Sequence, residues 1–436
     1  MMRSLFSGVS GLKNHQTRMD VIGNNISNVN TTGFKSSRVT FADTLNQTLT
    51  GASAPTDNLG GTNPKQIGLG SAVSSIDLLF TDGSVQSTGK NTDLCLSGNG
   101  LFVISNGSQT YYTRNGAFEF DAEGNYTMPG SGYLVQGWTA TDGVLNTSDA
   151  VGNIVVPAGK SMAAKATSIA TYANNLNSAA TTITAINGAT TSPITATTTA
   201  PATLTMSDGT TVTQTSGTYT VGYSLPVTTT LTIYDTLGNV HSLPVYFTKT
   251  LVDSTNGNEW TVSINTDGTG TTNWTESDGS TTTVAMTDVT LQFTTEGKYS
   301  TGSGTATLTL TNGATGTQTV SVDLSNLTQY AGNNTVNGST NGNAAGTLES
   351  VAIDASGIIT GTYTNGIKQS EAQVAVAQFT NASGLTKTGS SLYQESNNSG
   401  TPNVKTAADL GVKITGAGFP VYKDKGAKLQ RARSEE

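Results

Sequence analysis

The side chains that most often carry out chemistry are scarce in this chain of 436 residues. It has two histidines, His15 and His241, and one cysteine, Cys95. Two histidines exclude a histidine-cluster metal site and leave few options for a histidine-based catalytic triad, so we expect both to be structural or solvent-facing. Cys95 lies in an alternating run without a neighbouring His or Lys to activate its thiol, which predicts a buried strand residue. A lone cysteine also forms no internal disulfide.

Carboxylates offer one more route to catalysis. Asp121 with Glu123, or Asp77 with Asp82, could in principle supply the acid and base of a sugar-cleaving enzyme. Asp side chains normally cap turns, however, and turn residues are frequent here. The chain also lacks a G-x-S-x-G nucleophile motif and a G-x-x-x-x-G-K-S/T phosphate loop. We therefore expect no enzyme, no cofactor and no metal site.

The N-terminus carries a pattern that predicts assembly. Apolar residues follow one another at separations of 4, 3, 7, 3, 4 and 3 positions, as one face of a helix requires. The members of this apolar stripe are Leu5, Val9, Leu12, Met19, Ile22, Ile26 and Val29. A stripe this narrow suits a partner helix from another chain or from the far terminus. We predict an assembly helix within residues 1–32. We expect its opposite side, which carries Asn14, Asn24, Asn25 and Asn28, to be hydrated.

The rest of the chain is rich in Thr, Gly and Asn, which predicts strands and turns. We expect a mainly β, multi-domain chain with a nested insertion. An extended connector covers residues 33–71, a discontinuous first β-domain covers 72–146 and 345–402, and one or more Thr-rich outer β-domains cover 147–344. The clearest predicted hairpin runs from Tyr111 to Phe120 around the Asn115-Gly116 turn.

Charge and hydropathy exclude two classes of partner. The net charge is −8, with 21 Lys and Arg against 29 Asp and Glu, so the chain has no broad basic surface for nucleic acid. No run of about 18 apolar residues occurs, which argues against membrane insertion. The N-terminal segment is too broken by polar residues and glycine to be a signal peptide.

The segment from Asp20 to Lys35 resembles the N-terminal signature shared by the axial proteins of the bacterial flagellum. The matching motif residues are Asn24, Asn25, Asn28, Asn30, Thr31, Gly33 and Phe34. Within this group the hook subunits are the best match, through residues 91–103, 112–118, 132–138 and 233–241. Another axial protein, from the distal rod or the hook-associated set, is the alternative, and a β-rich surface adhesin is a more distant one.

The resemblance implies a structural subunit of the flagellar hook, a curved hollow tube outside the cell that acts as a flexible joint and transmits torque from rod to filament. Its implied partners are further copies of itself, the rod and hook–filament junction proteins, and the hook cap during assembly. The flagellar type III export apparatus would carry it out of the cell without a cleaved signal peptide.

The C-terminal end departs from this family. Axial subunits normally end in a long helix that packs on the N-terminal one, whereas here Leu410, Val412 and Ile414 alternate with period two. We expect residues 403–436 to be an atypical tail, produced by a frameshift or another alteration of the usual ending. Without an in-chain mate for the apolar stripe, we also expect weakened polymerisation.

Overall fold

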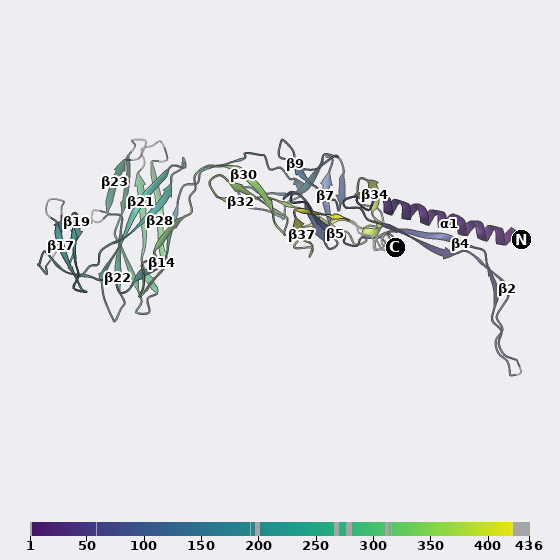
Figure 1. Cartoon of the computed structure of the whole chain (residues 1–436), viewed down its shortest axis with the longest axis horizontal. Coiled ribbons are helices and arrows are strands. Elements are labelled where there is room, and N and C mark those ends of the chain that lie inside the picture. The colour runs from purple at the N-terminus through teal and green to yellow at the C-terminus, as the bar shows by residue number, and fades with distance from the viewer. Residues whose placement is uncertain are drawn as a thin grey trace, which may run out of the picture. The chain divides into compact units, whose positions relative to one another are not determined.

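The structure is a computed structural model that describes residues 2–57, 59–191, 193–196, 201–265, 270–275, 281–309, 314 and 316–421. It divides into two compact units, which we call unit 1 (residues 1–160 and 348–436) and unit 2 (residues 161–347). Unit 2 therefore interrupts unit 1 in the sequence. The expectation of a mainly β chain with an N-terminal helix is confirmed (Figure 1).

The helix α1 spans Met2–Ser27. It ends where Asn and Thr side chains compete for backbone hydrogen bonds, as when the Asn28 side chain donates to the carbonyl oxygen of Asn24 at 2.9 Å. Gly33 then takes the left-handed conformation with a φ of 69°. Val29 was predicted as part of the helical stripe, but it lies beyond the end of the helix, in the turn formed by residues 28–30.

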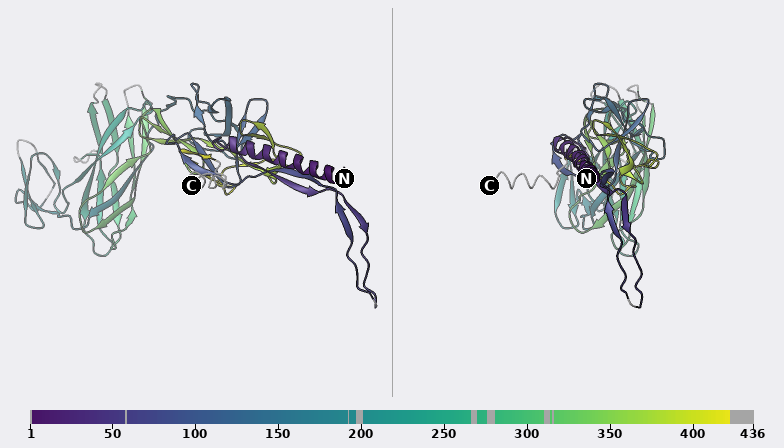
Figure 2. Two further views of the ribbon diagram at one scale, coloured as in Figure 1. Left: turned by 45° about the vertical axis from the view of Figure 1, so that its right-hand side comes forward. Right: turned by 90° about the vertical axis from the view of Figure 1, so that its right-hand side faces the viewer.

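The segment expected as an extended connector forms two antiparallel ladders. β1 (Ser37–Asp43) pairs with β4 (Ser71–Leu78), and β2 (Asn46–Thr50) pairs with β3 (Lys65–Gly68). Figures 1 and 2 show the β2–β3 hairpin as a long arm that continues from the β1–β4 ladder. α1 lies along β1 and β4, so this ladder is the surface on which the helix docks.

The main sheet of unit 1 joins strands from both of its sequence segments, in the order β30-β31-β32-β11-β7-β8-β35-β34. Its early strands and their neighbours are β5 (Ser84–Ser87), β6 (Leu94–Ser97), β7 (Leu101–Ser105), β8 (Thr110–Thr113), β9 (Glu119–Phe120), β10 (Tyr126–Met128), β11 (Tyr133–Thr139) and β12 (Gly152–Asn153). The returning elements are β30 (Gly346–Ile353), β31 (Ile358–Tyr363), β32 (Lys368–Val374), β33 (Val376–Gln378), the 3-10 helix η1 (Ala382–Gly384), β34 (Thr386–Gly389) and β35 (Leu392–Gln394).

The predicted hairpin around Asn115-Gly116 is wrong. β8 pairs with β7 and β35, while β9 pairs with β10, so the two strands flanking this turn do not pair with each other. The reason is a close backbone approach: Leu94 donates its N–H to the carbonyl oxygen of Gly116 at 2.8 Å. A Cβ at Gly116 would lie 1.6 Å from the Leu94 carbonyl oxygen. Glycine here allows two segments to meet instead of closing a turn.

The expected C-terminal tail must also be corrected. β36 (Asn403–Lys405) pairs with β33, β37 (Lys413–Gly416) with β6, and β38 (Gly418–Val421) with β5. Val412 and Ile414 are buried in the core of unit 1, because their period-two alternation places both on the inner face of the chain. Residues 403–421 thus belong to the β-structure of unit 1, and residues 422–436 lie outside the described part of the chain.

Unit 2 contains two packed sheets. One has the order β23-β24-β27-β28-β14-β29 and the other β20-β21-β22-β25-β26 (Figure 1). The inward residues of both sheets form one core that includes Tyr172, Phe247 and Trp260. The strands of the first sheet are β14 (Ile169–Asn177), β23 (Thr271–Thr275), β24 (Thr281–Met286), β27 (Ser303–Thr309), β28 (Thr317–Tyr330) and β29 (Asn337–Thr340). Those of the second are β20 (Val227–Tyr234), β21 (Val240–Leu251), β22 (Glu259–Ser263), β25 (Val289–Phe293) and β26 (Tyr299–Thr301).

The remaining strands of unit 2 fall mostly in the Thr-rich stretch. β15 (Ile183–Ile186), β17 (Ala202–Met206) and β18 (Thr211–Gln214) form a small sheet with its own core of Ile183, Ile186 and Leu204. β16 (Ile194–Ala196) pairs with β19 (Gly217–Tyr219). The first strand of the unit, β13 (Ser161–Met162), pairs with the start of β30, so the two ends of unit 2 meet.

Candidate assembly surface

The two faces of α1 meet different surroundings. On its polar face the Asn14 side chain donates to the Ser71 hydroxyl at 2.8 Å, and the Ser10 hydroxyl accepts from the Ser71 N–H at 3.4 Å. Glycine precedes Ser71 at position 70, where a Cβ would lie 2.4 Å from the Ser10 hydroxyl oxygen. The helix therefore approaches the β1–β4 ladder closely through small and polar side chains.

Asn25 fixes the other end of the helix. Its side-chain nitrogen donates to the Ser37 carbonyl oxygen at 2.8 Å, and its side-chain oxygen accepts from the Ser37 N–H at 3.1 Å. The expectation that the asparagine side is hydrated is thus wrong for Asn14, which is buried, and for Asn25, which is half-buried. A neutral side-chain amide both donates and accepts hydrogen bonds, so it can pair with the N–H and C=O groups of a strand as a neighbouring strand would.

The opposite face of α1 carries the predicted apolar stripe, and most of it is exposed. The exposed fraction runs from 37% for Ile22 to 73% for Leu12. Val29, in the turn, is half-buried. The six exposed members on the helix are Leu5, Val9, Leu12, Met19, Ile22 and Ile26. Exposed apolar surface that is continuous in this way is typical of interaction sites, so the stripe is the candidate assembly surface.

The motif residues after the helix build a joint between α1 and the β-structure. Asn28 donates to the Asn24 side-chain oxygen at 3.0 Å, and Thr31 donates to the Asn28 side-chain oxygen at 3.1 Å. At Gly33 a Cβ would lie 2.4 Å from the backbone nitrogen of Asn115, so only glycine allows this approach. The resemblance to axial proteins identified these positions as a motif, but the hydrogen bonds become visible only in the structure.

Phe34 and its neighbours lie against the β34–β35 turn. The Lys387 ammonium sits over the Phe34 ring, 4.6 Å from its centroid, and donates to the Lys35 carbonyl oxygen at 2.8 Å. The Ser391 hydroxyl donates to the Thr32 carbonyl oxygen at 2.9 Å. Asn30, the remaining motif residue, is exposed. The joint therefore links chain segments more than 350 residues apart.

A buried cationic cluster lies next to this joint, and nothing in the sequence pointed to it. Lys35 is almost fully buried and donates to the Thr81 carbonyl oxygen at 2.6 Å. Arg114 is also buried and donates to the Asp82 carboxylate at 3.3 Å and the Leu96 carbonyl oxygen at 3.0 Å. Burial, followed by the nearby Arg114 guanidinium, lowers the pKa of Lys35 from 10.5 to about 8.

Cys95 is buried in β6, as predicted. Burial raises the pKa of its thiol, which keeps the sulfur protonated and unreactive.

The carboxylates considered for catalysis have structural partners. Asp121 accepts from the Asn125 side chain at 2.8 Å and from the Glu123 N–H at 2.9 Å, and the hydrogen bond from Asn125 lowers the pKa of Asp121. Asp77 pairs with Arg38 at 3.3 Å, and Asp82 pairs with Arg114. The side chains of Asp121, Asp77 and Asp82 therefore serve a turn or an ion pair, and Glu123 contributes its backbone N–H to the same turn as Asp121.

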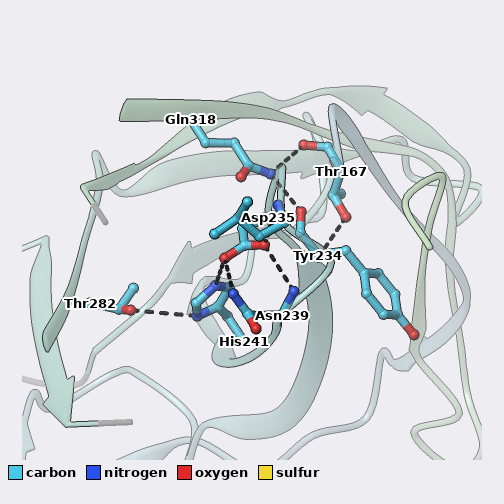
Figure 3. Close-up of polar contacts among 8 residues, drawn as sticks. Thr167, Tyr234, Asp235, Asn239, His241, Thr282 and Gln318 are labelled. Atoms are coloured by element: carbon cyan, nitrogen blue, oxygen red, sulfur yellow. Dashed lines mark hydrogen bonds and ion pairs between the residues drawn. The ribbon is translucent and has the colours of Figure 1, made fainter. Parts of the chain in front are cut away.

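Unit 2 holds a group that resembles a catalytic triad in composition (Figure 3). The Thr282 hydroxyl lies 3.4 Å from Nδ1 of His241, whose Nε2 lies 3.3 Å from a carboxylate oxygen of Asp235. All three are buried, with exposed fractions of 0 or 1%, so no substrate could reach the hydroxyl. The carboxylate also accepts two backbone N–H groups, from Leu237 and Asn239, each at 2.8 Å. This arrangement holds the β20–β21 turn, and His241 is structural.

His15, on α1, makes an edge-on contact with the Phe41 ring at 5.9 Å. Within the described residues, no helix combines the length and apolarity needed to cross a membrane.

Three protein-family models match the chain. Residues 5–35 match the model for the flagella basal body rod protein, residues 95–174 the flagellar hook protein FlgE/F/G D1 domain, and residues 222–343 the flagellar basal body protein FlaE D2 domain. The first match covers the apolar stripe and the motif described above.

Related proteins match most of the chain. The flagellar hook protein FlgE of Treponema pallidum is 37% identical, over 94% of this chain and 89% of its own length. That of Borreliella burgdorferi is also 37% identical, over 92% of this chain and 86% of its own length. Among solved structures, the Helicobacter pylori flagellar hook protein FlgE2 has a similar fold, with a TM-score of 0.50 and 16% identity over 78% of this chain and 100% of that one.

Proposed function

The chain belongs to the flagellar hook protein family and is a structural subunit of the hook rather than an enzyme, and from this we propose that the exposed stripe of α1 joins copies of this chain. One observation carries the proposal. α1 is held on the β1–β4 ladder by hydrogen bonds from its polar face, while its apolar face remains exposed. Docking within the chain therefore leaves the assembly face open.

The energy of this surface is large enough to drive assembly. Fully burying one exposed Leu, Ile, Val or Met side chain contributes about 1.5–3 kcal/mol. The six side chains are 37% to 73% exposed, so covering the exposed part of all six contributes roughly 5–10 kcal/mol before the entropy of association is subtracted. A heptad-like stripe selects a helix as the partner. We propose that this helix comes from another copy of the chain.

Membership of the family supports a proposal for the specific partners. We propose that copies polymerise into a curved tube that works as a flexible joint, and that the ends of this tube meet rod and hook–filament junction proteins. We further propose that the hook cap guides assembly and that the type III export apparatus delivers the chain without a cleaved signal peptide. The motif joint supports this role, because it holds α1 firmly to the β-structure of unit 1.

Substitution of the stripe tests the proposal. Leu12→Gln, Met19→Gln and Ile26→Gln together remove three apolar side chains while keeping good helix formers. We expect the polymer that sediments at a fixed concentration to fall at least tenfold, because the helix–helix contact loses much of its apolar area. Circular dichroism checks that the monomer keeps its fold.

The matched control changes exposed polar residues of the same helix, Lys13→Gln and Asp20→Asn, and should polymerise like the unmodified chain. A stripe variant that polymerises normally would overturn the proposal. In cells, a strain that lacks its hook gene should build rods without hooks, and this chain should restore the hooks.

A further inference from the structure

A polar cavity of about 360 Å³ lies at one end of the two packed sheets of unit 2. This volume falls within the range of about 300–1,000 Å³ that is typical of small-molecule sites. The cavity forms where strands of both sheets end: after β14, in the loop between β21 and β22, in the β25–β26 turn and at the end of β28. Its lining includes Val252, Asp253, Asn258, Glu296, Gln329 and Tyr330.

The buried side of the cavity carries an amide group that lacks a partner. Gln329 is 3% exposed and lies in β28, whose alternate residues point between the two sheets. Its side-chain oxygen accepts from the Asn258 side chain at 3.2 Å, whereas its side-chain nitrogen makes no hydrogen bond within the described part of the chain. Leaving a buried donor unpaired destabilises the fold, so a ligand or an ordered water is expected at this nitrogen.

The loop between β21 and β22 supplies a fixed acceptor. One carboxylate oxygen of Asp253 accepts from the N–H groups of Thr255 at 2.7 Å and Asn256 at 3.2 Å. The other oxygen accepts from the Asn256 side chain at 2.8 Å. These hydrogen bonds, led by the one from Thr255, lower the pKa of Asp253 and keep the carboxylate ionised at neutral pH. A carboxylate has about four acceptor positions, so one is left for a ligand.

Apolar surface borders the same cavity. Tyr330 is 49% exposed and Val252 is also exposed, although both line the cavity. The Tyr330 backbone is fixed by Asn175, whose side-chain oxygen accepts its N–H at 2.7 Å and whose side-chain nitrogen donates to its carbonyl oxygen at 3.1 Å. An accessible aromatic ring beside a few convergent polar groups is the usual composition of a small-molecule site.

The charges of the cavity exclude two classes of ligand. Asp253 and Glu296 contribute carboxylates, and the described residues that line the cavity include no ammonium or guanidinium group, so an anion would be repelled. The free nitrogen of Gln329 is a donor, which disfavours a bare metal ion, and the described chain holds no cluster of His, Cys, Asp and Glu suited to a metal. A neutral ligand that both accepts and donates hydrogen bonds remains.

We propose that this cavity binds one ring of a neutral saccharide. A ring hydroxyl accepts from the Gln329 side-chain nitrogen, a second hydroxyl donates to the Asp253 carboxylate, and the apolar C–H face of the ring packs on Tyr330. Because all the lining residues belong to unit 2, the site needs no contact between copies and is independent of the proposed function. On a polymer of many copies, weak sites of this kind would together hold a glycan-coated surface more tightly than one site does.

Saturation-transfer NMR with the full chain tests the proposal. The probes are the methyl glycosides of glucose, galactose, mannose and N-acetylglucosamine, and the methyl glycoside of glucuronic acid is the anionic control. At least one neutral probe should bind with a dissociation constant on the order of 1–10 mM, as expected for so small a ligand. The glucuronic acid probe should bind at least tenfold more weakly. If no neutral probe binds, water satisfies Gln329 and the inference is overturned, and equal binding of the anionic probe has the same consequence.

Two substitutions locate the bound sugar. Gln329→Met removes the buried donor while keeping the length of the side chain, and we expect the affinity to fall about tenfold. Tyr330→Ala removes an exposed ring without touching its backbone hydrogen bonds, so it covers the case in which Gln329→Met folds poorly; here the affinity should fall about fivefold. Circular dichroism checks the fold of each variant.

The matched control is Tyr223→Ala, which removes another exposed tyrosine of unit 2 that does not line this cavity. It should bind the sugar like the unmodified chain. Normal affinity in Tyr330→Ala, or loss of binding in Tyr223→Ala instead, would place the sugar elsewhere and overturn the inference. Binding should also be equal in EDTA and in calcium chloride. A strict need for calcium would mean that the carboxylates hold a cation, and the inference would fall.

Discussion

Lys35 illustrates how one residue ties the helix joint to the stability of unit 1. It follows Gly33 and Phe34 directly, and its backbone and side chain contact different segments: its carbonyl oxygen accepts from Lys387 in β34, and its ammonium donates to the Thr81 carbonyl oxygen between β4 and β5. Burying a cation beside Arg114 disfavours the charged form. Lys35 therefore links two segments of unit 1, while the burial of its positive charge lowers the stability of the folded chain.

The buried charge of Lys35 predicts that the free energy of unfolding depends on pH. The pKa of Lys35 is about 8 in the folded chain against 10.5 in the unfolded one, so between these values the unfolded state binds more protons and stability rises with pH. The destabilisation caused by burying the charged Lys35 side chain is fully present below pH 8 and diminishes as the pH rises above this value. From pH 7.5 to 9.5 we expect the free energy of unfolding to gain about 2 kcal/mol from this site.

Urea unfolding at the two pH values measures the effect. The gain should vanish in Lys35→Met and persist in Lys90→Met, which changes an exposed lysine. Equal pH dependence in all three chains would show that Lys35 titrates normally.

At the scale of elements, Asn25 is predicted to hold the C-terminal half of α1 on its ladder. Asn25→Ala removes both hydrogen bonds to Ser37, each worth about 1 kcal/mol, so local opening should become roughly thirtyfold more frequent. Hydrogen exchange of the amides in residues 15–27 measures this. Asn30→Ala, at an exposed motif position, is the control, and unchanged exchange in Asn25→Ala would show that other contacts dock the helix.

The spacing of apolar residues along the sequence predicted those elements that depend on neighbouring residues. The period of apolar residues identified α1 and its stripe. The period-two run of Leu410, Val412 and Ile414 argued against a long terminal helix, and in the structure it leads through a turn into β37, which begins at Lys413. Pairing partners were not predictable in this way. Asn115-Gly116 has the composition of a hairpin turn, yet Gly116 meets Leu94. The docking role of Asn14 was missed because its partner, Ser71, lies 57 residues away.

At the scale of the whole molecule, unit 2 can interrupt unit 1 because the chain leaves unit 1 and returns to it at neighbouring residues. The Lys160 carbonyl oxygen accepts the N–H of Leu348 at 2.8 Å, which closes unit 1 at the point where unit 2 leaves and returns. One residue further on, Ser161 lies opposite Thr347 in the β13–β30 pairing. The two ends of unit 2 are therefore adjacent, and so are the two residues of unit 1 that flank it in the sequence. Adjacent ends favour independent folding of each unit.

We accordingly predict that residues 161–347 fold when produced alone. The main core of this unit draws its buried residues from positions 170 to 327, all inside the fragment, and the pairing of Ser161 with Thr347 brings its termini together. Calorimetry should show one cooperative transition within a few degrees of a transition of the full chain. The complementary protein, with residues 160 and 348 joined by a short Gly-Ser linker, should show the other. A fragment that unfolds without cooperativity, or far below the full chain, would mean that unit 2 depends on residues of unit 1 for its fold.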